Sequence, residues 1–193
     1  SVRIDQSGRF SAVTLLRAMS PKYSTDSDLI RTFYESRVEK VVDGRSVSKL
    51  QDKFAVDDVV YPSGSERAGE IIVEAGHQIT KEIAEIICTA GVKRVEVIDP
   101  PNTRLIFNSL AEDATSSHEE ALLRIYQRLR PGNPPQLEKA RTLFQEKFFD
   151  SNRYRLGRVG RFRINRKLGL NVPESEMVLR PEDLIEALRY LLA

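Results

Sequence analysis

The side chains most able to do chemistry lie in one basic run of the chain. Residues 153–167 read RYRLGRVGRFRINRK and contain no acidic residue. The basic members of the run are Arg153, Arg155, Arg158, Arg161, Arg163, Arg166 and Lys167. Most are arginines, whose planar guanidinium group can hold a phosphate or a guanine edge through two parallel hydrogen bonds. The run therefore predicts a contact with nucleic acid, and a solvated face without a ligand remains the alternative.

The faces of this run depend on its secondary structure. If its end forms a strand, alternate residues point to opposite sides. Arg161, Arg163 and Asn165 then share one face, while Phe162 and Ile164 point into the core.

Other reactive residue types are isolated. Cys88 stands between apolar neighbours and is expected to be a small core residue, and His77 and His118 are expected at the surface. Asp57 and Asp58 have no third ligand nearby, so they do not predict a metal site. We therefore expect this chain to have no catalytic residues and no metal site of its own.

Composition places these residues in an ordinary globular chain. It has 193 residues, 40% of them hydrophobic and 30% charged, which allows one domain or two small ones. No apolar run approaches the about 18 residues of a membrane span, and no signal peptide is evident. One cysteine suits a reducing cytoplasm. Because the chain begins at Ser1 without an initiator Met, we expect it to be a piece of a longer protein.

Charge is distributed unevenly along the chain. Residues 57–120 carry 13 acidic and 5 basic side chains, whereas residues 121–168 carry 13 basic and 3 acidic ones. This segregation predicts an anion-facing surface and a separate acidic part that avoids it.

Hydrophobic spacing predicts a mixture of helices and strands, and hence an α+β fold. Thr80 is a suitable N-cap for a helix that ends at Gly91, with an apolar stripe of Ile83, Ile86 and Ile87. The following VKRVEVID alternates like a half-buried strand. Earlier, a helix is expected to begin at residues 24–26. The valines before Asp43-Gly44, a turn dipeptide, suggest a hairpin there.

Three further helices are expected in the carboxyl-terminal half. One begins after Ser116-Ser117 and ends before Pro131, and the next covers residues 137–149. The last begins with Pro181 at its first helical position.

Several motifs resemble one stretch of the β subunit of bacterial RNA polymerase. They are RLRPGNPP (128–135), LFQEKFF (143–149), NRYRLGRVGR (152–161) and INRKL (164–168). These motifs lie in a domain of the β subunit that is called the lobe. VRID (2–5), followed by AVTLLRA (12–18), resembles the start of this lobe, and RPEDLIEALRYLL resembles a helix near the end of the lobe. The order of the motifs is the same, so the resemblance covers nearly the whole chain.

The resemblance implies a lobe domain that is interrupted by a small module. Residues 1–31 and 112–193 are expected to form the lobe, and residues 32–53 a connecting hairpin. Residues 54–111 resemble the β–helix–β inserts that vary between bacterial lineages, here with an acidic composition.

It also implies a role for three residues in a pocket for an unpaired guanine of the non-template DNA strand. Asp5 would accept hydrogen bonds from the guanine edge, and Arg130 and Arg153 would contact the base or its backbone. A structural ion pair of Asp5 or Arg153 within the lobe is the alternative. The other basic residues of 153–167 are candidates for backbone contacts. The basic run that commonly follows VRID in the family is reduced here, which weakens the expected grip at Asp5.

Finally, the resemblance implies the partners. They are downstream DNA, the α, β′ and σ subunits and the rest of β, in a cytoplasmic, nucleoid-associated enzyme without membrane contact. Mg²⁺ of the whole nucleotidyltransferase is held by β′, so no cofactor is expected here. The alternative is an assembly or regulator-docking module that acts through the 54–111 insert and would expose an apolar patch there.

Overall fold

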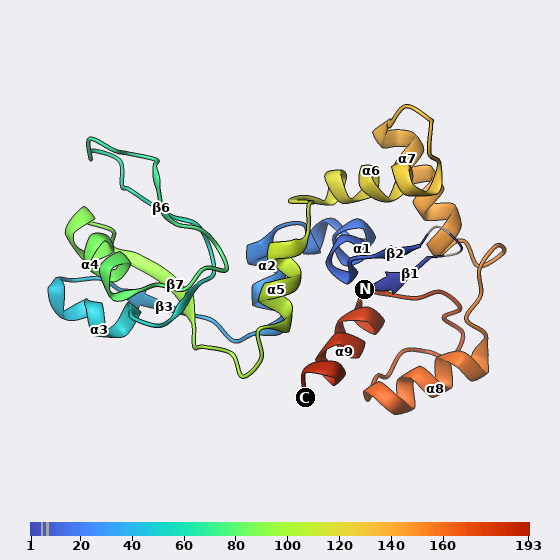
Figure 1. Ribbon diagram of the computed structural model, residues 1–193. Helices are drawn as coiled ribbons and strands as arrows, with labels where there is room; N and C mark the ends of the chain where they lie inside the picture. The colour runs from blue at the N-terminus through green and yellow to red at the C-terminus, as the bar shows by residue number, and fades with distance from the viewer. Residues whose placement is uncertain (5, 7) are drawn as a thin grey trace. The chain divides into compact units, whose positions relative to one another are not determined.

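The structure, a computed structural model, describes every residue of the chain except 5 and 7. It divides into two compact units, which Figure 1 shows in ribbon form. Unit 1 consists of Ser1–Thr25 and Ala111–Ala193, and unit 2 consists of Asp26–Leu110. Both contain helices and strands, which confirms the α+β fold class.

Unit 1 is mostly helical. Its described elements are β1 (Val2–Arg3), β2 (Arg9–Phe10), α1 (Ala12–Met19), η1 (Pro21–Tyr23), α6 (His118–Leu129), α7 (Leu137–Phe144), η3 (Gln145–Phe149), α8 (Arg158–Leu168) and α9 (Pro181–Leu192). The two short strands pair antiparallel, with Val2 opposite Phe10. Two predicted helix starts are confirmed, because Ser117 Oγ accepts a hydrogen bond from the Glu120 amide and Pro181 lies in the first turn of α9.

The core of unit 1 lies where α1 packs against α6 and α6 packs against α7. Its buried members are Ile4, Phe10, Leu15, Ala18, Ala121, Leu122, Ile125, Tyr126, Ala140 and Phe144. The π-helical turn η3 continues α7 and stacks Phe148 on Phe144 with ring centroids 4.4 Å apart. On another side, α9 contacts both α1 and α8. This packing positions α6, which ends beside Arg130, and α8, which contains most of the basic run.

Unit 2 is built around a small sheet. Its elements are α2 (Asp26–Phe33), β3 (Arg37–Lys40), η2 (Gly44–Ser46), α3 (Val47–Leu50), β4 (Phe54–Ala55), β5 (Val59–Val60), β6 (Ile71–Val73), α4 (Lys81–Ala90), β7 (Arg94–Ile98) and α5 (Leu105–Glu112), whose end passes the unit boundary. The strands β3, β7 and β4 form an antiparallel sheet in that order, and β5 pairs with β6. Ile79, Ile87 and Val97 are fully buried in its core.

The predicted caps of α4 are confirmed. Thr80 Oγ1 accepts a hydrogen bond from the Ile83 amide, and Gly91 ends the helix at φ 83°. The predicted apolar stripe is narrower than expected, since Ile87 is fully buried but Ile86 is 41% exposed. The helix therefore buries one edge of the stripe and leaves the other on the surface.

The hairpin expected at Asp43-Gly44 is wrong. The strand before it, β3, pairs with the distant β7 through Arg37↔Val97, and η2 begins at Gly44. In this sheet β3 pairs with the central strand β7, and β4 pairs with the other side of β7. Such a three-stranded sheet is more stable than an isolated two-stranded hairpin, which is at best marginally stable in water. As a result β3 packs in unit 2, which begins at Asp26, and the expected 54–111 insert boundaries remain a prediction.

Candidate nucleic-acid interface

The end of the basic run forms the helix α8, so the strand expected there is wrong. Gly157 precedes the helix at φ 74°, and Gly169 ends it in the left-handed conformation at φ 67°. Because side chains repeat every 3.6 residues on a helix, the alternation expected for a strand does not hold. The expected sides are reversed for two residues, since Arg161 is fully buried and Phe162 is 49% exposed, whereas Arg163 is exposed as expected.

Arg161 is an internal anchor and not a surface cation. Its Nη1 lies 2.6 Å from Asp183 Oδ1, and its Nε donates a hydrogen bond to the Glu176 carbonyl at 3.1 Å. A further guanidinium nitrogen donates to the Val178 carbonyl. Asp183 in turn accepts a hydrogen bond from the Arg180 amide at the start of α9. Arg161 thus joins α8 to α9. Because it is buried and paired with Asp183, it cannot contact a phosphate, and its prediction as a DNA-contacting residue is wrong.

The remaining basic residues of α8 share one solvent-facing side. Since residues four apart lie one turn above each other, two adjacent rows run along this side. We call it the α8 basic face, and its exposed members are Arg158, Val159, Phe162, Arg163, Arg166 and Lys167. In the described part of the chain, Arg158, Arg163 and Arg166 have no carboxylate partner. Their charges are therefore available to an external anion.

Two apolar side chains interrupt this charged surface. Phe162 is 49% exposed and Val159 is 66% exposed, and both lie between the arginines. Lys167 Nζ lies 5.2 Å from the centre of the exposed Tyr190 ring, in cation–π geometry. An exposed aromatic ring between guanidinium groups offers a surface on which an unpaired base can stack.

Glu146 is associated with both of the predicted arginines Arg130 and Arg153, in different ways. Arg130 is exposed at the end of α6 and lines a shallow depression of about 360 Å³, together with Tyr126, Leu143 and Glu146. Arg153 is also exposed, and its Nη1 lies 3.3 Å from Glu146 Oε2. Glu146 therefore shares the depression with Arg130 and forms an ion pair with Arg153.

The alternative reading of Arg153 also has support. Besides Glu146, Arg153 has a second carboxylate partner, Asp150 Oδ2, at 3.9 Å from its Nε. Both ion pairs are solvent-exposed, and such pairs contribute little to folding, so they are easily exchanged for a ligand. The predicted pocket residue Asp5 lies outside the described residues. Arg155 is exposed in the loop before α8.

A buried polar cluster holds the two chain segments of unit 1 together. Arg17 on α1 is fully buried, and its Nε lies 3.2 Å from Asp113 Oδ2. Its Nη1 donates a hydrogen bond to the Ser24 carbonyl at 2.9 Å, and Thr14 Oγ1 donates to Asp113 at 2.6 Å. His118 Nδ1 lies 2.7 Å from the Arg17 carbonyl. A lone arginine in the apolar stretch SAVTLLRAM was the available sign of this cluster, and sequence reasoning missed it.

The other candidates for chemistry have structural roles. The Cys88 thiol is partly buried against the core of unit 2, and burial raises its pKa, which opposes reactivity. His77 is exposed as expected, whereas His118 is half-buried in the Arg17 cluster. Asp57 pairs with Arg31, while Asp58 accepts a hydrogen bond from the Ala75 amide. Nowhere in the described chain do three His, Cys, Asp or Glu residues gather as metal ligands.

Comparison with known proteins decides the family. A family model described as RNA polymerase Rpb2, domain 2, matches residues 71–193, which is more than half of the chain. The chain belongs to the RNA polymerase Rpb2 domain 2 family. The α8 basic face and the depression at Glu146 both lie within the matched part of this Rpb2 domain 2 chain.

Relatives of this Rpb2 domain 2 chain confirm the resemblance to the bacterial β subunit. It is 70% identical over its whole length to a DNA-directed RNA polymerase subunit beta from Rhodopirellula baltica, of which it covers 16%. It is 36% identical, over 94% of its length, to the subunit from Protochlamydia amoebophila and 35% identical to that from Chlamydia pneumoniae. It covers 14% of each of these two, so the chain spans about one sixth or less of the relatives it matches. None of the helices described in the structure is long and apolar enough to cross a bilayer.

Within the Rpb2 domain 2 chain, sequence reasoning missed Phe162 as a surface residue. The strand interpretation placed it in the core, whereas the four-residue spacing of Arg158, Phe162 and Arg166 was the signal for a shared helical side.

Proposed function

We propose that this chain is a non-catalytic part of a DNA-directed RNA polymerase and that unit 1 contacts DNA. The names of its relatives support the first part, and the α8 basic face supports the second. In this proposal the chain belongs to the lobe that lines the downstream DNA channel. It joins α, β′, σ and the rest of β in a cytoplasmic, nucleoid-associated enzyme whose catalytic Mg²⁺ is held by β′.

The spacing of the exposed arginines fits a nucleic-acid backbone. Arg158 and Arg166 are eight residues apart, which is about 12 Å along a helix. That length corresponds to about three to four nucleotides of one DNA strand, at 3.4 Å each. Guanidinium groups that have no carboxylate partner in the described structure can bind these phosphates without first losing an ion pair.

The exposed Phe162 favours unpaired DNA over duplex. Its ring is accessible between the arginines, and an aromatic ring can stack only on a base that has left the duplex stack. Contact at the edge of the transcription bubble, where duplex and single strand meet, uses both the charge and the ring of this face.

A guanine pocket formed by Asp5, Arg130 and Arg153 is the finer part of the proposal. Support for it comes from the depression beside Arg130, which is about 360 Å³ in volume, and from the contact of Arg153 with Glu146. Guanine presents N1–H and N2–H₂ donors on its pairing edge, and a carboxylate accepts both. Glu146, which lines the depression with Arg130 and pairs with Arg153, therefore offers an acceptor in addition to Asp5.

A second candidate function, docking of a regulator or assembly partner, rests on unit 2. Val60 and Ile71 oppose each other across β5 and β6, and they are 41% and 50% exposed. On the edge strand β3 and just after it, Val38 is 58% and Val42 is 78% exposed. Such apolar side chains on the surface are the feature that a docking module requires.

Binding of a forked DNA with a single-stranded non-template arm tests the DNA contact. We expect the triple variant Arg158→Gln, Arg163→Gln, Arg166→Gln to bind more weakly. The slope of log K against log salt should fall by about 2 to 3 in magnitude, because three phosphate contacts are lost. Fluorescence anisotropy at several salt concentrations measures both quantities.

The matched control removes the same charge from unit 2. The triple variant Arg45→Gln, Lys49→Gln, Lys81→Gln changes three exposed cations of unit 2, outside the α8 basic face, and is expected to preserve both affinity and slope. Equal loss in the two triple variants would mean that net charge alone, and not the α8 basic face, determines binding.

Reconstitution tests the placement in the polymerase. The chain is added to α, β′ and pieces of β that lack this segment, and templated RNA synthesis is measured. Restored synthesis that is sensitive to Arg130→Ala and Arg153→Ala supports the channel role. Assembly without any effect of the chain on synthesis contradicts it and favours docking through unit 2.

A further inference from the structure

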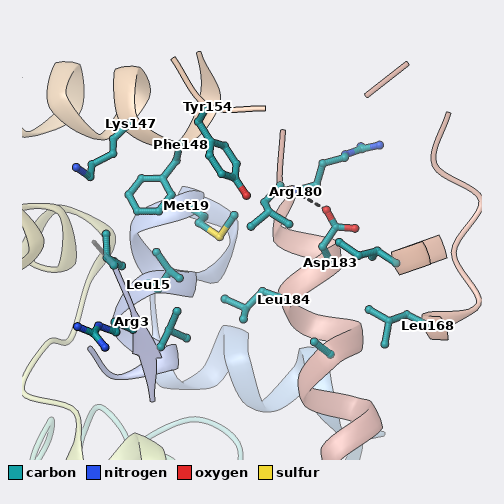
Figure 2. Close-up of a pocket in the computed structure, with 15 residues that line it drawn as sticks. Arg3, Leu15, Met19, Lys147, Phe148, Tyr154, Leu168, Arg180, Asp183 and Leu184 are labelled. Atoms are coloured by element: carbon teal, nitrogen blue, oxygen red, sulfur yellow. Dashed lines mark hydrogen bonds between the residues drawn. The ribbon is translucent and has the colours of Figure 1, made fainter. Parts of the chain in front are cut away.

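Unit 1 contains an apolar pocket that the proposed DNA contact does not use. It has a volume of about 410 Å³ and lies between β1, α1, η3, α8 and α9 (Figure 2). Its apolar walls include Leu15, Met19, Phe148, Ile164 and Leu184. A concave site of this size, lined mostly by apolar side chains, is typical of small-molecule binding sites in proteins.

One polar group is directed into this pocket. Figure 2 shows the hydroxyl group of Tyr154 pointing into it beside Met19. Among the described residues this hydroxyl has no hydrogen-bond partner. Tyr154 therefore offers one hydrogen bond to an occupant, and the rest of its ring adds to the apolar wall.

The charged groups at the pocket do not face an occupant. Both carboxylate oxygens of Asp183 are engaged, one by Arg161 and the other by the Arg180 amide. The charged ends of Arg3, Lys147 and Arg180 point outward in Figure 2, so that their carbon chains line the pocket. A charged ligand would lose its hydration here without gaining a counter-ion in the interior.

We propose that this pocket binds a small, uncharged aromatic molecule that carries one hydrogen-bond acceptor. The apolar walls hold its ring, and Tyr154 Oη donates a hydrogen bond to the acceptor. Such a ligand bridges α1, α8 and α9, and so supports the element that carries the α8 basic face. The proposal is independent of the DNA contact, because none of its residues belongs to that face.

The two methionines of the chain provide a direct readout. Met19 lines the pocket, whereas Met177 does not. In the full chain labelled with ¹³C-methyl methionine, we expect quinoline at pH 7.5 to shift the Met19 signal by its ring current and to leave Met177 in place. For a ligand of this size we expect a Kd of about 0.1–1 mM. Equal shifts of both signals, or none, overturn the proposal.

The acceptor is tested with naphthalene, which has the same shape as quinoline but no nitrogen. We expect quinoline to bind about threefold to tenfold more tightly, as one neutral hydrogen bond allows. Tyr154→Phe should abolish this difference and leave naphthalene binding unchanged. A preference that persists in Tyr154→Phe shows that the hydroxyl is not the donor and overturns that part of the assignment.

Blocking the pocket completes the test. Ala187→Phe places a ring in the space and should remove the Met19 shift, whereas Leu191→Phe on the same helix, at a 70% exposed position, should not. If Ala187→Phe unfolds the chain, the smaller Ala187→Leu is used, with folding checked by circular dichroism. Undiminished binding in a folded Ala187 variant places the ligand elsewhere.

Discussion

Arg161 and Asp183 are buried opposite charges that stabilise unit 1 only as a pair. Taking both groups out of water is costly, and the 2.6 Å contact with two carbonyl hydrogen bonds offsets that cost. The same sequence stretch thus contains arginines with two different tasks. Arg161 holds α8 against the start of α9, and its neighbours on the exposed side remain free to meet an anion.

Removing one partner of this pair should be strongly destabilising. Arg161→Met leaves Asp183 buried without a counter-charge, and we expect a loss of about 3–5 kcal/mol of unfolding free energy. Adding Asp183→Asn should restore part of this loss, because the amide oxygen still accepts the Arg180 hydrogen bond without a charge. Chemical denaturation measures the free energies. The control Arg163→Met, at an exposed position, should cost less than about 0.5 kcal/mol, and an equal cost would show that Arg161 is not an anchor.

At the scale of elements, local signals in the sequence predicted where helices begin and end better than they predicted which strands pair. Thr80, Gly91, Ser117 and Pro181 were assigned as caps or first residues, and each has that role. A helix cap depends on residues within about four positions of one another, so a short stretch of sequence contains all the information needed to predict it. The pairing of β3 with β7 joins residues about 57 positions apart, and no local pattern contains that information.

The helix α8 shows why the candidate site was only partly predictable. Its sequence alternates basic and apolar residues over Arg161–Ile164, which is the pattern of a strand. Burial of Arg161 by Asp183 comes from another helix, 22 residues later, and it overrides the local pattern. The sequence therefore predicted the basic members of the exposed side, but it wrongly included Arg161 and left out Phe162.

The α8 basic face leads to a prediction about Phe162. Because its ring is half exposed, Phe162→Ala should change the unfolding free energy by less than about 1 kcal/mol. Affinity for single-stranded DNA should fall by about 1–3 kcal/mol, the usual contribution of one stacked base. Anisotropy titrations with single-stranded and duplex oligonucleotides measure the difference. Val159→Ala is the control on the same face, and a similar loss for single strand and duplex would exclude stacking.

At the scale of the whole molecule, the two units differ in charge. Unit 1 carries 19 basic and 13 acidic residues, whereas unit 2 carries 11 basic and 15 acidic residues. The sequence predicted this segregation correctly, because charge is read directly from composition. The compact unit 2 begins at Asp26, and its strand β3 pairs with the later strand β7, whereas the boundaries of the expected 54–111 insert remain a prediction.

Unit 2 should lose stability in acid through Glu96. Arg31 donates hydrogen bonds to the Glu96 carboxylate, Ser36 donates a further one, and together they hold its pKa at about 2. The folded pKa lies below the usual 4.5 of the unfolded state. The unfolded state therefore binds more protons between pH 4.5 and 2, and the stabilisation present at neutral pH is lost as the pH falls through this window.

Glu96→Gln tests this pH dependence. At pH 7 we expect a loss of about 1 kcal/mol, since the partner Arg31 is partly exposed and solvent screens the pair. Between pH 4.5 and 2 the variant should show a shallower decline than the parent chain. Amide hydrogen exchange on β7 measures the opening of unit 2. Glu85→Gln, on the exposed side of α4, should keep the parent pH profile, and an unchanged profile in Glu96→Gln would contradict the assignment.

The Arg17 cluster has a consequence for the order in which the chain folds during synthesis. The ribosome releases α1 with Arg17 long before Asp113, its buried counter-ion, because all of Asp26–Leu110 lies between them. At about 5–20 residues per second, this interval lasts roughly 4–20 s. Unit 2, which is continuous in sequence, completes its own contacts during that delay. Until the later part of unit 1 is synthesised, the apolar helix α1 lacks its partner α6, and the Arg17 charge lacks its counter-ion Asp113.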